Sequence, residues 1–128
     1  MISDVKIIRT VYGSLDNTVF REIPSIPTIS NQIVYVWGID NEKWLNNRGY
    51  ETRLQSESEV PDFIDDTNHF FRKLISLKKS LEEFGEVLLL DWDCRILKPF
   101  DETFYGYLNE KPIQCPIYSH PMDLKNTY

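Results

Sequence analysis

Runs of hydrophobic residues closed by glycine or polar residues predict four of the strands in this chain. Residues 5–12 and 33–37 are two such runs, rich in β-branched side chains, and a glycine follows each of them. Residues 50–54 alternate weakly between polar and apolar positions, which predicts a third strand nearer the edge of a sheet. The four consecutive aliphatic residues 87–90 predict a fourth strand, buried on both faces.

Segments with helical periodicity lie between these predicted strands. The longest predicted helix ends at Gly85, and acidic and hydroxyl side chains of residues 65–67 are available to cap its start. Its apolar residues recur at spacings of three and four and predict a core-facing stripe: Phe70, Phe71, Leu74, Leu77, Leu81 and Phe84. A shorter helix is predicted over residues 41–47. Beyond the fourth strand, residues 101–108 predict a helix and residues 113–118 a last strand, bent by Pro116.

The order of these elements predicts the fold class. A long helix that leads through one glycine into a buried strand is typical of a βαβ unit. We therefore expect an α/β protein with a Rossmann-like three-layer core, in which helices flank a mostly parallel sheet. A length of 128 residues suits a single domain covering residues 1–128, and there is no internal repeat.

Charge and composition narrow the choice of partners and compartment. The net charge of −6 argues against nucleic acid and anionic membranes as partners. No apolar run is long enough to span a bilayer, and the first residues lack a signal-peptide pattern. Cys94 and Cys115 have neither Cys-x-x-Cys spacing nor nearby histidines, so a reduced, cytoplasmic protein is the simplest interpretation.

The candidate chemistry lies where the fourth predicted strand ends. Asp91 and Asp93 place two carboxylates one residue apart at the expected carboxyl edge of the sheet, where open α/β folds bind ligands. Two such carboxylates repel each other unless a cation or a shared proton lies between them. Mg²⁺ and Mn²⁺ accept one or two carboxylates together with phosphate and water oxygens. The pair therefore predicts a Mn²⁺ or Mg²⁺ site, against the alternative of one capping and one solvated carboxylate.

The segment from the long helix to residue 100 resembles the nucleotide-sugar-binding core of GT-A fold glycosyltransferases. In that family a hydrophobic strand ends in Asp-x-Asp and is often followed by Leu-Lys-Pro, as Leu97-Lys98-Pro99 follow here. The resemblance covers most of this chain but only about the first half of a usual family member. It implies a metal-dependent transferase that takes a nucleotide-diphospho-sugar donor, with UDP-hexose as the expected donor and an acceptor that the sequence does not identify.

This resemblance also implies a set of site residues. Asp93 is the expected direct metal ligand, while Asp91 ligates the metal or holds the ribose and a metal-bound water. The nucleotide and donor sugar are expected to contact Thr10, Tyr12, Trp37, Arg72, Asp91 and Trp92. Packing in the core is the alternative for each aromatic residue of this set, and exposed helix charge is the alternative for Arg72 and the neighbouring Lys73.

The remaining candidates are fewer and less specific. His120 is considered as a third metal ligand, with an exposed loop imidazole as the alternative. No residue after Asp93 stands out as a general base, so the catalytic base stays unassigned. We expect the acceptor side to lie beyond this chain unless a partner chain or a second copy completes it, and water to be the nucleophile otherwise.

Two other function classes remain open. A non-catalytic nucleotide-sugar binding module would use the same residues without turnover. A haloacid-dehalogenase-type phosphatase also places Asp-x-Asp after a hydrophobic strand, but Cys94 and Arg95 stand where that family has Gly-Thr or similar residues. Release of UDP from a UDP-sugar distinguishes the transferase from the binding module. Activity on a phosphomonoester would favour the phosphatase.

Overall fold

The computed structural model describes residues 5–13, 31–61, 70–94 and 102–103. The chain divides into two compact units, one of Ser3–Pro99 with Met1 and the other of Phe100–Tyr128 with Ile2. In the second unit, Glu102 and Thr103 are helical and exposed. The predictions that fall on residues 65–67, 97–99, 101, 104–108, 113–118 and His120 lie outside the described residues. The single domain stays a prediction.

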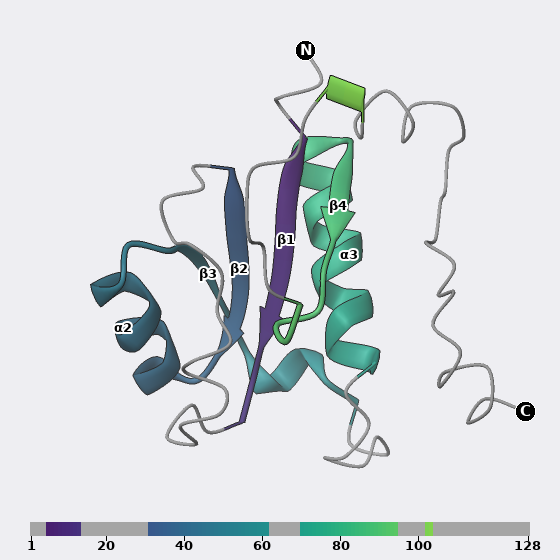
Figure 1. Ribbon diagram of the computed structural model, residues 1–128. Coiled ribbons are helices and arrows are strands. Elements are labelled where there is room, and N and C mark those ends of the chain that lie inside the picture. Colours follow the sequence, from purple (N-terminus) through teal and green to yellow (C-terminus); the bar gives the residue numbers. More distant parts are fainter. Residues whose placement is uncertain (1–4, 14–30, 62–69, 95–101, 104–128) are drawn as a thin grey trace, which may run out of the picture. The chain divides into compact units, whose positions relative to one another are not determined.

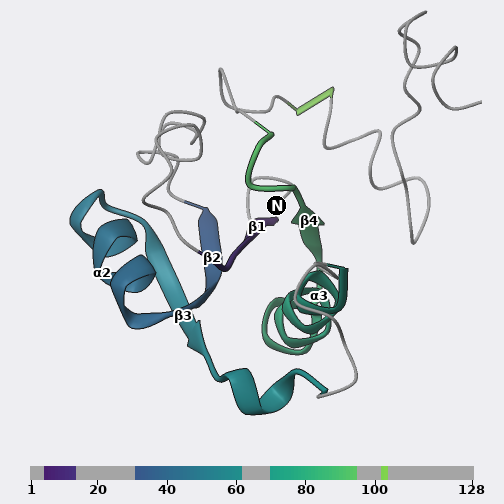
Figure 2. The same ribbon diagram turned by 90° about the horizontal axis from the view of Figure 1, so that it is seen from below.

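The first unit contains a four-stranded sheet in which every pairing is parallel. Its elements in chain order are β1 (Lys6–Val11), β2 (Gln32–Trp37), α2 (Ile39–Asn47), β3 (Glu51–Gln55), the 3-10 helix η2 (Glu57–Glu59), α3 (Phe70–Phe84) and β4 (Val87–Leu89). The strand order is β3-β2-β1-β4. Helices α2 and α3 lie on opposite sides of this sheet (Figures 1 and 2). The predicted α/β class with a parallel, helix-flanked, Rossmann-like core is confirmed.

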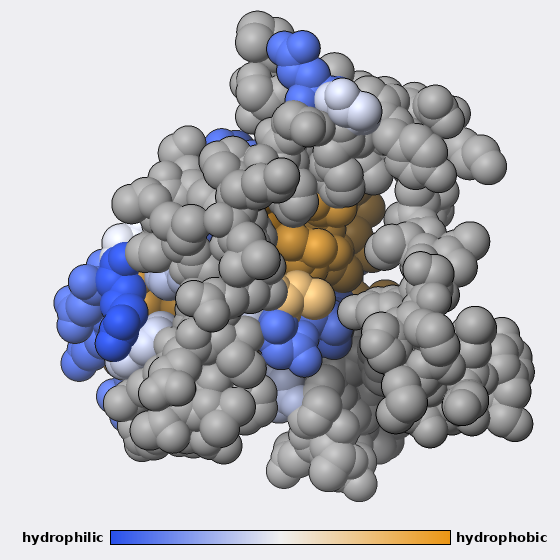
Figure 3. All heavy atoms as spheres, viewed as in Figure 1, coloured by the Kyte–Doolittle hydropathy of each residue, from blue (hydrophilic) through white to orange (hydrophobic). Residues whose placement is uncertain are grey.

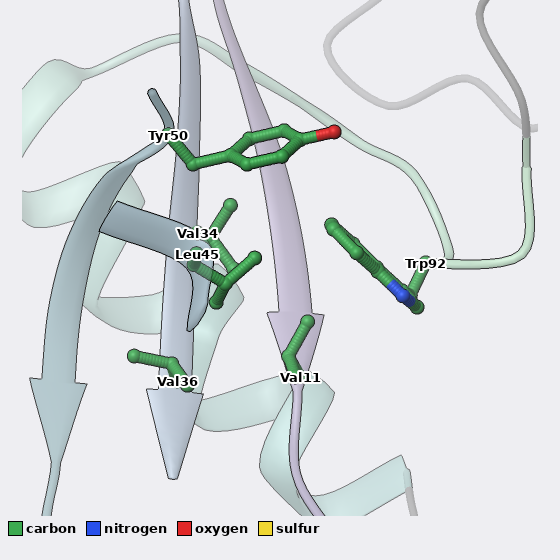
Figure 4. Close-up of a cluster of buried hydrophobic side chains, with 6 residues drawn as sticks. All are labelled: Val11, Val34, Val36, Leu45, Tyr50 and Trp92. Atoms are coloured by element: carbon green, nitrogen blue, oxygen red, sulfur yellow. The ribbon is translucent and has the colours of Figure 1, made fainter. Parts of the chain in front are cut away.

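Alternate residues of the strands form a core on each face of the sheet. The cluster on the α2 face consists of Val11, Val34, Val36, Leu45, Tyr50 and Trp92 (Figure 4). The cluster on the α3 face consists of Ile8, Ile33, Tyr35 and Trp37, with Ile75 and Phe84 of α3 packed against it. Because side chains alternate along a strand, neighbouring residues of β1 and β2 serve opposite cores.

The predicted core stripe of α3 is wrong for two of its leucines, Leu74 and Leu81, whereas Leu77 is half-buried and Phe84 packs against the core as predicted. Leu74 is 58% exposed and Leu81 44% exposed, whereas the buried residues of the helix include Arg72, Ser76 and Ser80. Ser76 donates a hydrogen bond to the Arg72 carbonyl, and Ser80 donates one to the Leu77 carbonyl, so neither hydroxyl is buried without a partner. Small residues spaced by four favour close approach of the helix to the sheet on this side, and Leu74 and Leu81 face away from it.

Strand β4 differs from the prediction of a strand buried on both faces. Residues 87–90 are all half-buried, because β4 is the outermost strand on its side of the described sheet. Figure 3 shows apolar atoms gathered over this part of the molecule. The predicted connection is confirmed: the Gly85 N–H bonds the Leu81 carbonyl at 2.9 Å, and Gly85 takes a φ of 82°, which favours glycine.

The two leucines Leu45 and Leu74 give a direct test of which residues form the core. Leu45 is fully buried, so Leu45→Ala should lower the free energy of unfolding by about 2–5 kcal/mol. Leu74→Ala should change it by no more than about 0.5 kcal/mol, as expected of an exposed position. Urea unfolding of both variants measures the difference. A large loss from Leu74→Ala would mean that the leucine stripe of α3 is covered in solution.

Candidate functional site

The candidate site lies at the carboxyl edge of the sheet, between β1 and β4. The order β3-β2-β1-β4 reverses direction at this pair of strands, and open α/β folds bind ligands in the crevice outside the strand ends at such a switch point. Tyr12 and Gly13 follow β1, and residues 90–93 follow β4. Since α3 leads directly into the start of β4, its own first turn lies at this same edge (Figure 1). Three segments distant in sequence therefore meet here.

A buried arginine holds the turn that carries the two aspartates. Arg9 is fully buried on β1, and its Nη1 donates to the main-chain carbonyls of Asp91 and Cys94, both at 2.6 Å. Its Nε donates to Gln32 Oε1 at 3.2 Å. Burial lowers the pKa of the Arg9 guanidinium, an effect that nearby Tyr50 and the groups of the turn oppose. The turn itself is closed by the Cys94 N–H, which bonds the Asp91 carbonyl at 3.0 Å.

Trp92 anchors the same turn through packing. It is buried in the core cluster on the α2 face, and its ring meets that of Tyr50 edge to face, with centroids 5.6 Å apart (Figure 4). The Arg9 guanidinium carbon lies 5.9 Å from the Trp92 ring centroid. Of the two roles considered for Trp92, packing is therefore observed. The tryptophan and the arginine together fix the backbone on which Asp91 and Asp93 stand.

The two aspartates of this turn have different surroundings. Asp91 Oδ1 lies 2.7 Å from Lys73 Nζ, an ion pair that joins the turn to α3. Asp93 is exposed. Within the described ranges, no three His, Cys, Asp or Glu side chains come together as a ready-made metal site. Two exposed carboxylates in one turn do fit a Mg²⁺ or Mn²⁺ ion that takes its other ligands from phosphate and water.

A second group at this edge joins Tyr12, Trp37 and Arg72. The guanidinium carbon of Arg72 lies 4.7 Å from the Tyr12 ring centroid and 5.8 Å from that of Trp37. Its Nη2 pairs with Glu57 Oε2 at 2.8 Å, and Glu57 is largely exposed. Arg72 Nε and Trp37 Nε1 are buried N–H groups for which the described part of the chain supplies no hydrogen-bond partner. Arg72 is thus a buried cation at the sheet edge, not an ordinary exposed helix charge.

Polar side chains also tie the ends of the strands together. The Thr10 hydroxyl donates to Ser76 Oγ on α3 at 2.9 Å, so it is engaged inside the protein. Asn41 Nδ2 donates to the Gly13 carbonyl at 2.6 Å and to the Trp37 carbonyl at 2.9 Å. Gly13 has a φ of 77°, a conformation that few other residues adopt without strain. These bonds fix the end of β1 against the end of β2.

The structure thus places all six expected nucleotide and donor residues at or near one edge, in different environments. Tyr12 is half-buried and Asp91 is exposed, whereas Thr10, Trp37, Arg72 and Trp92 are buried. Sequence reasoning missed the roles of Arg9 and Asn41. A charged residue within an apolar strand was the available signal for Arg9, because such a residue needs buried partners.

Comparisons with known proteins add no relative. Neither the protein-family models, nor the curated proteins, nor the solved structures searched contain a match to this chain. Among the helices that the structure describes, none has the length and apolar character to cross a membrane. The cytoplasmic location and a homo-oligomeric state stay predictions.

Proposed function

We propose that this chain is a metal-dependent glycosyltransferase that uses a nucleotide-diphospho-sugar donor, with a UDP-hexose as the donor. One observation carries the proposal: the turn with Asp91 and Asp93 stands at the switch point between β1 and β4, beside two cations of α3. The resemblance to GT-A glycosyltransferases in the segment that forms α3, β4 and this turn supports the same assignment.

The charges of the site suit a diphosphate bound through a cation. Asp93 and Asp91 would hold Mn²⁺ or Mg²⁺, and such an ion, when bound, neutralises negative charge on a diphosphate leaving group. Lys73 and Arg72 lie on the first turns of α3, at the same edge. Their positive charges attract the phosphates of a donor. They also compensate the negative charge of the two carboxylates while no metal ion is bound.

The nucleoside would lie along the end of β1. Tyr12 is the half-buried aromatic residue there, and Arg72 lies over its ring. Stacking of a base on an aromatic side chain contributes about 1–3 kcal/mol in nucleic-acid binders. Trp37 and Thr10 are buried, and they contact Arg72 and Ser76 of α3, respectively. We therefore assign them to the support of α3 and not to direct contact with the nucleoside.

Donor hydrolysis tests this function without knowledge of the acceptor. When no acceptor is added, water supplies the nucleophile. Its oxygen bonds the anomeric carbon and loses a proton to solvent, while the bond from that carbon to the β-phosphate oxygen breaks and UDP leaves with the electron pair. We expect slow UDP release over hours from at least one UDP-hexose in Mn²⁺, and none above background in EDTA.

Two controls separate the alternatives. Asp93→Ala should release UDP no faster than the EDTA sample, whereas Glu82→Ala, which removes an exposed carboxylate of α3, should match the unmodified protein. UDP binding without release from any donor would favour the binding module over the enzyme. Rapid hydrolysis of a phosphomonoester without release of UDP would favour the phosphatase.

A further inference from the structure

The ion pair between Lys73 and Asp91 places a positive charge where a metal ion would bind. Lys73 Nζ lies 2.7 Å from Asp91 Oδ1, and the lysine side chain is 26% exposed against 50% for the aspartate. An ammonium at hydrogen-bond distance from a carboxylate oxygen reduces the negative charge available to a second cation. A divalent ion that approaches this oxygen must displace the ammonium or bind beside a like charge.

The two partners of this ion pair are attached to the fold in different ways. The Asp91 backbone is fixed by Arg9 and by the buried Trp92. The lysine is a flexible side chain with a compact charge and rotatable donors, so it can move when its partner is taken. Arg72 is less suited to such a movement, because its guanidinium is buried, paired with Glu57 and packed over Tyr12.

We propose that Lys73 is a resident cation of this site: it occupies Asp91 while the site is empty, and it transfers to the phosphates of the ligand when a divalent ion binds Asp91. This inference rests on the proposed function for its ligand, a nucleoside diphosphate. It has a thermodynamic consequence. The metal ion alone must compete with Lys73, while the diphosphate relieves that competition, so metal and diphosphate each raise the affinity of the protein for the other.

Binding of Mn²⁺ alone gives the most direct test. The electron paramagnetic resonance signal of free Mn²⁺ is followed as the ion is titrated with the unmodified protein and with Lys73→Met. We expect Lys73→Met to bind Mn²⁺ about tenfold more tightly, since it removes a positive charge a few ångströms from the bound ion. Lys78→Met, at an exposed position of the same helix, makes the same change of charge and should bind Mn²⁺ like the unmodified protein.

The same titration with UDP present tests the transfer of the lysine. UDP should tighten Mn²⁺ binding at least about tenfold in the unmodified protein, after correction for the Mn²⁺–UDP complex in solution, and clearly less in Lys73→Met. Thermal melts show whether each variant is folded, and Lys73→Gln replaces Lys73→Met if the latter is not.

The outcomes distinguish this inference from the proposed function. Equal Mn²⁺ affinity of Lys73→Met and the unmodified protein would overturn the resident cation, even if UDP binds both. Tighter Mn²⁺ binding by Lys73→Met, with no effect of UDP on either protein, would retain Lys73 as the resident cation and would instead count against the nucleotide site.

Discussion

Arg9→Met should lower the free energy of unfolding by about 3 kcal/mol or more, because hydrogen bonds to a charged group contribute about 1.5–3 kcal/mol each. The substitution leaves the main-chain carbonyls of Asp91 and Cys94 and the side chain of Gln32 without the donors that Arg9 provides. It should also weaken UDP binding in the protein that still folds, since the turn between Asp91 and Cys94 loses its attachment to β1. Urea unfolding and UDP titration measure the two effects.

Two further variants show whether the effect belongs to this arginine. Arg9→Lys keeps the charge but cannot reproduce the forked geometry of the guanidinium, so it should recover only part of the stability. Arg53→Met removes an arginine that is paired with Glu51 and Glu83 at the surface, and it should cost no more than about 1 kcal/mol. Equal losses from Arg9→Met and Arg53→Met would contradict the role given to Arg9.

Asp93→Ala should reduce the affinity for UDP in Mn²⁺ by about 100-fold. Loss of one carboxylate beside a divalent ion costs on the order of 3 kcal/mol at an exposed position, which corresponds to this factor. Asp91→Ala should lose less, because it releases Lys73 to the phosphates while it removes a metal ligand. Calorimetric titration of both variants with UDP checks this order. A greater loss from Asp91→Ala than from Asp93→Ala would reverse the roles of the two carboxylates.

The strands and helices could be predicted from sequence because their signals are local. Apolar runs followed by glycine indicated β1 and β2, and three-to-four periodicity indicated α3. The face that α3 turns to the sheet could be predicted only in part in this way, because Phe84 packs against the core but Leu74 and Leu81 are exposed. The leucine pattern was the stronger periodic signal, but close packing favoured the side that carries Ser76 and Ser80, and this choice depends on the sheet opposite.

The site could be predicted in part for the same reason. Asp91 and Asp93 stand out because they follow an aliphatic run, and the switch point then gives them their place at the sheet edge. The contacts that organise them are long-range. Nothing local in the sequence pairs Arg9 with the carbonyls of the turn, or Lys73 with Asp91, because those pairs form only when β1, α3 and β4 come together.

The central claim is that the edge between β1 and β4 binds a nucleoside diphosphate through a divalent ion. Calorimetric titration of the unmodified protein with UDP, once in Mn²⁺ and once in EDTA, tests it most directly. We predict clear binding in Mn²⁺ and little or none in EDTA, because the carboxylates of the turn repel a diphosphate that arrives without a cation. Equal affinity for UDP in both titrations, or no binding in either, would contradict the claim.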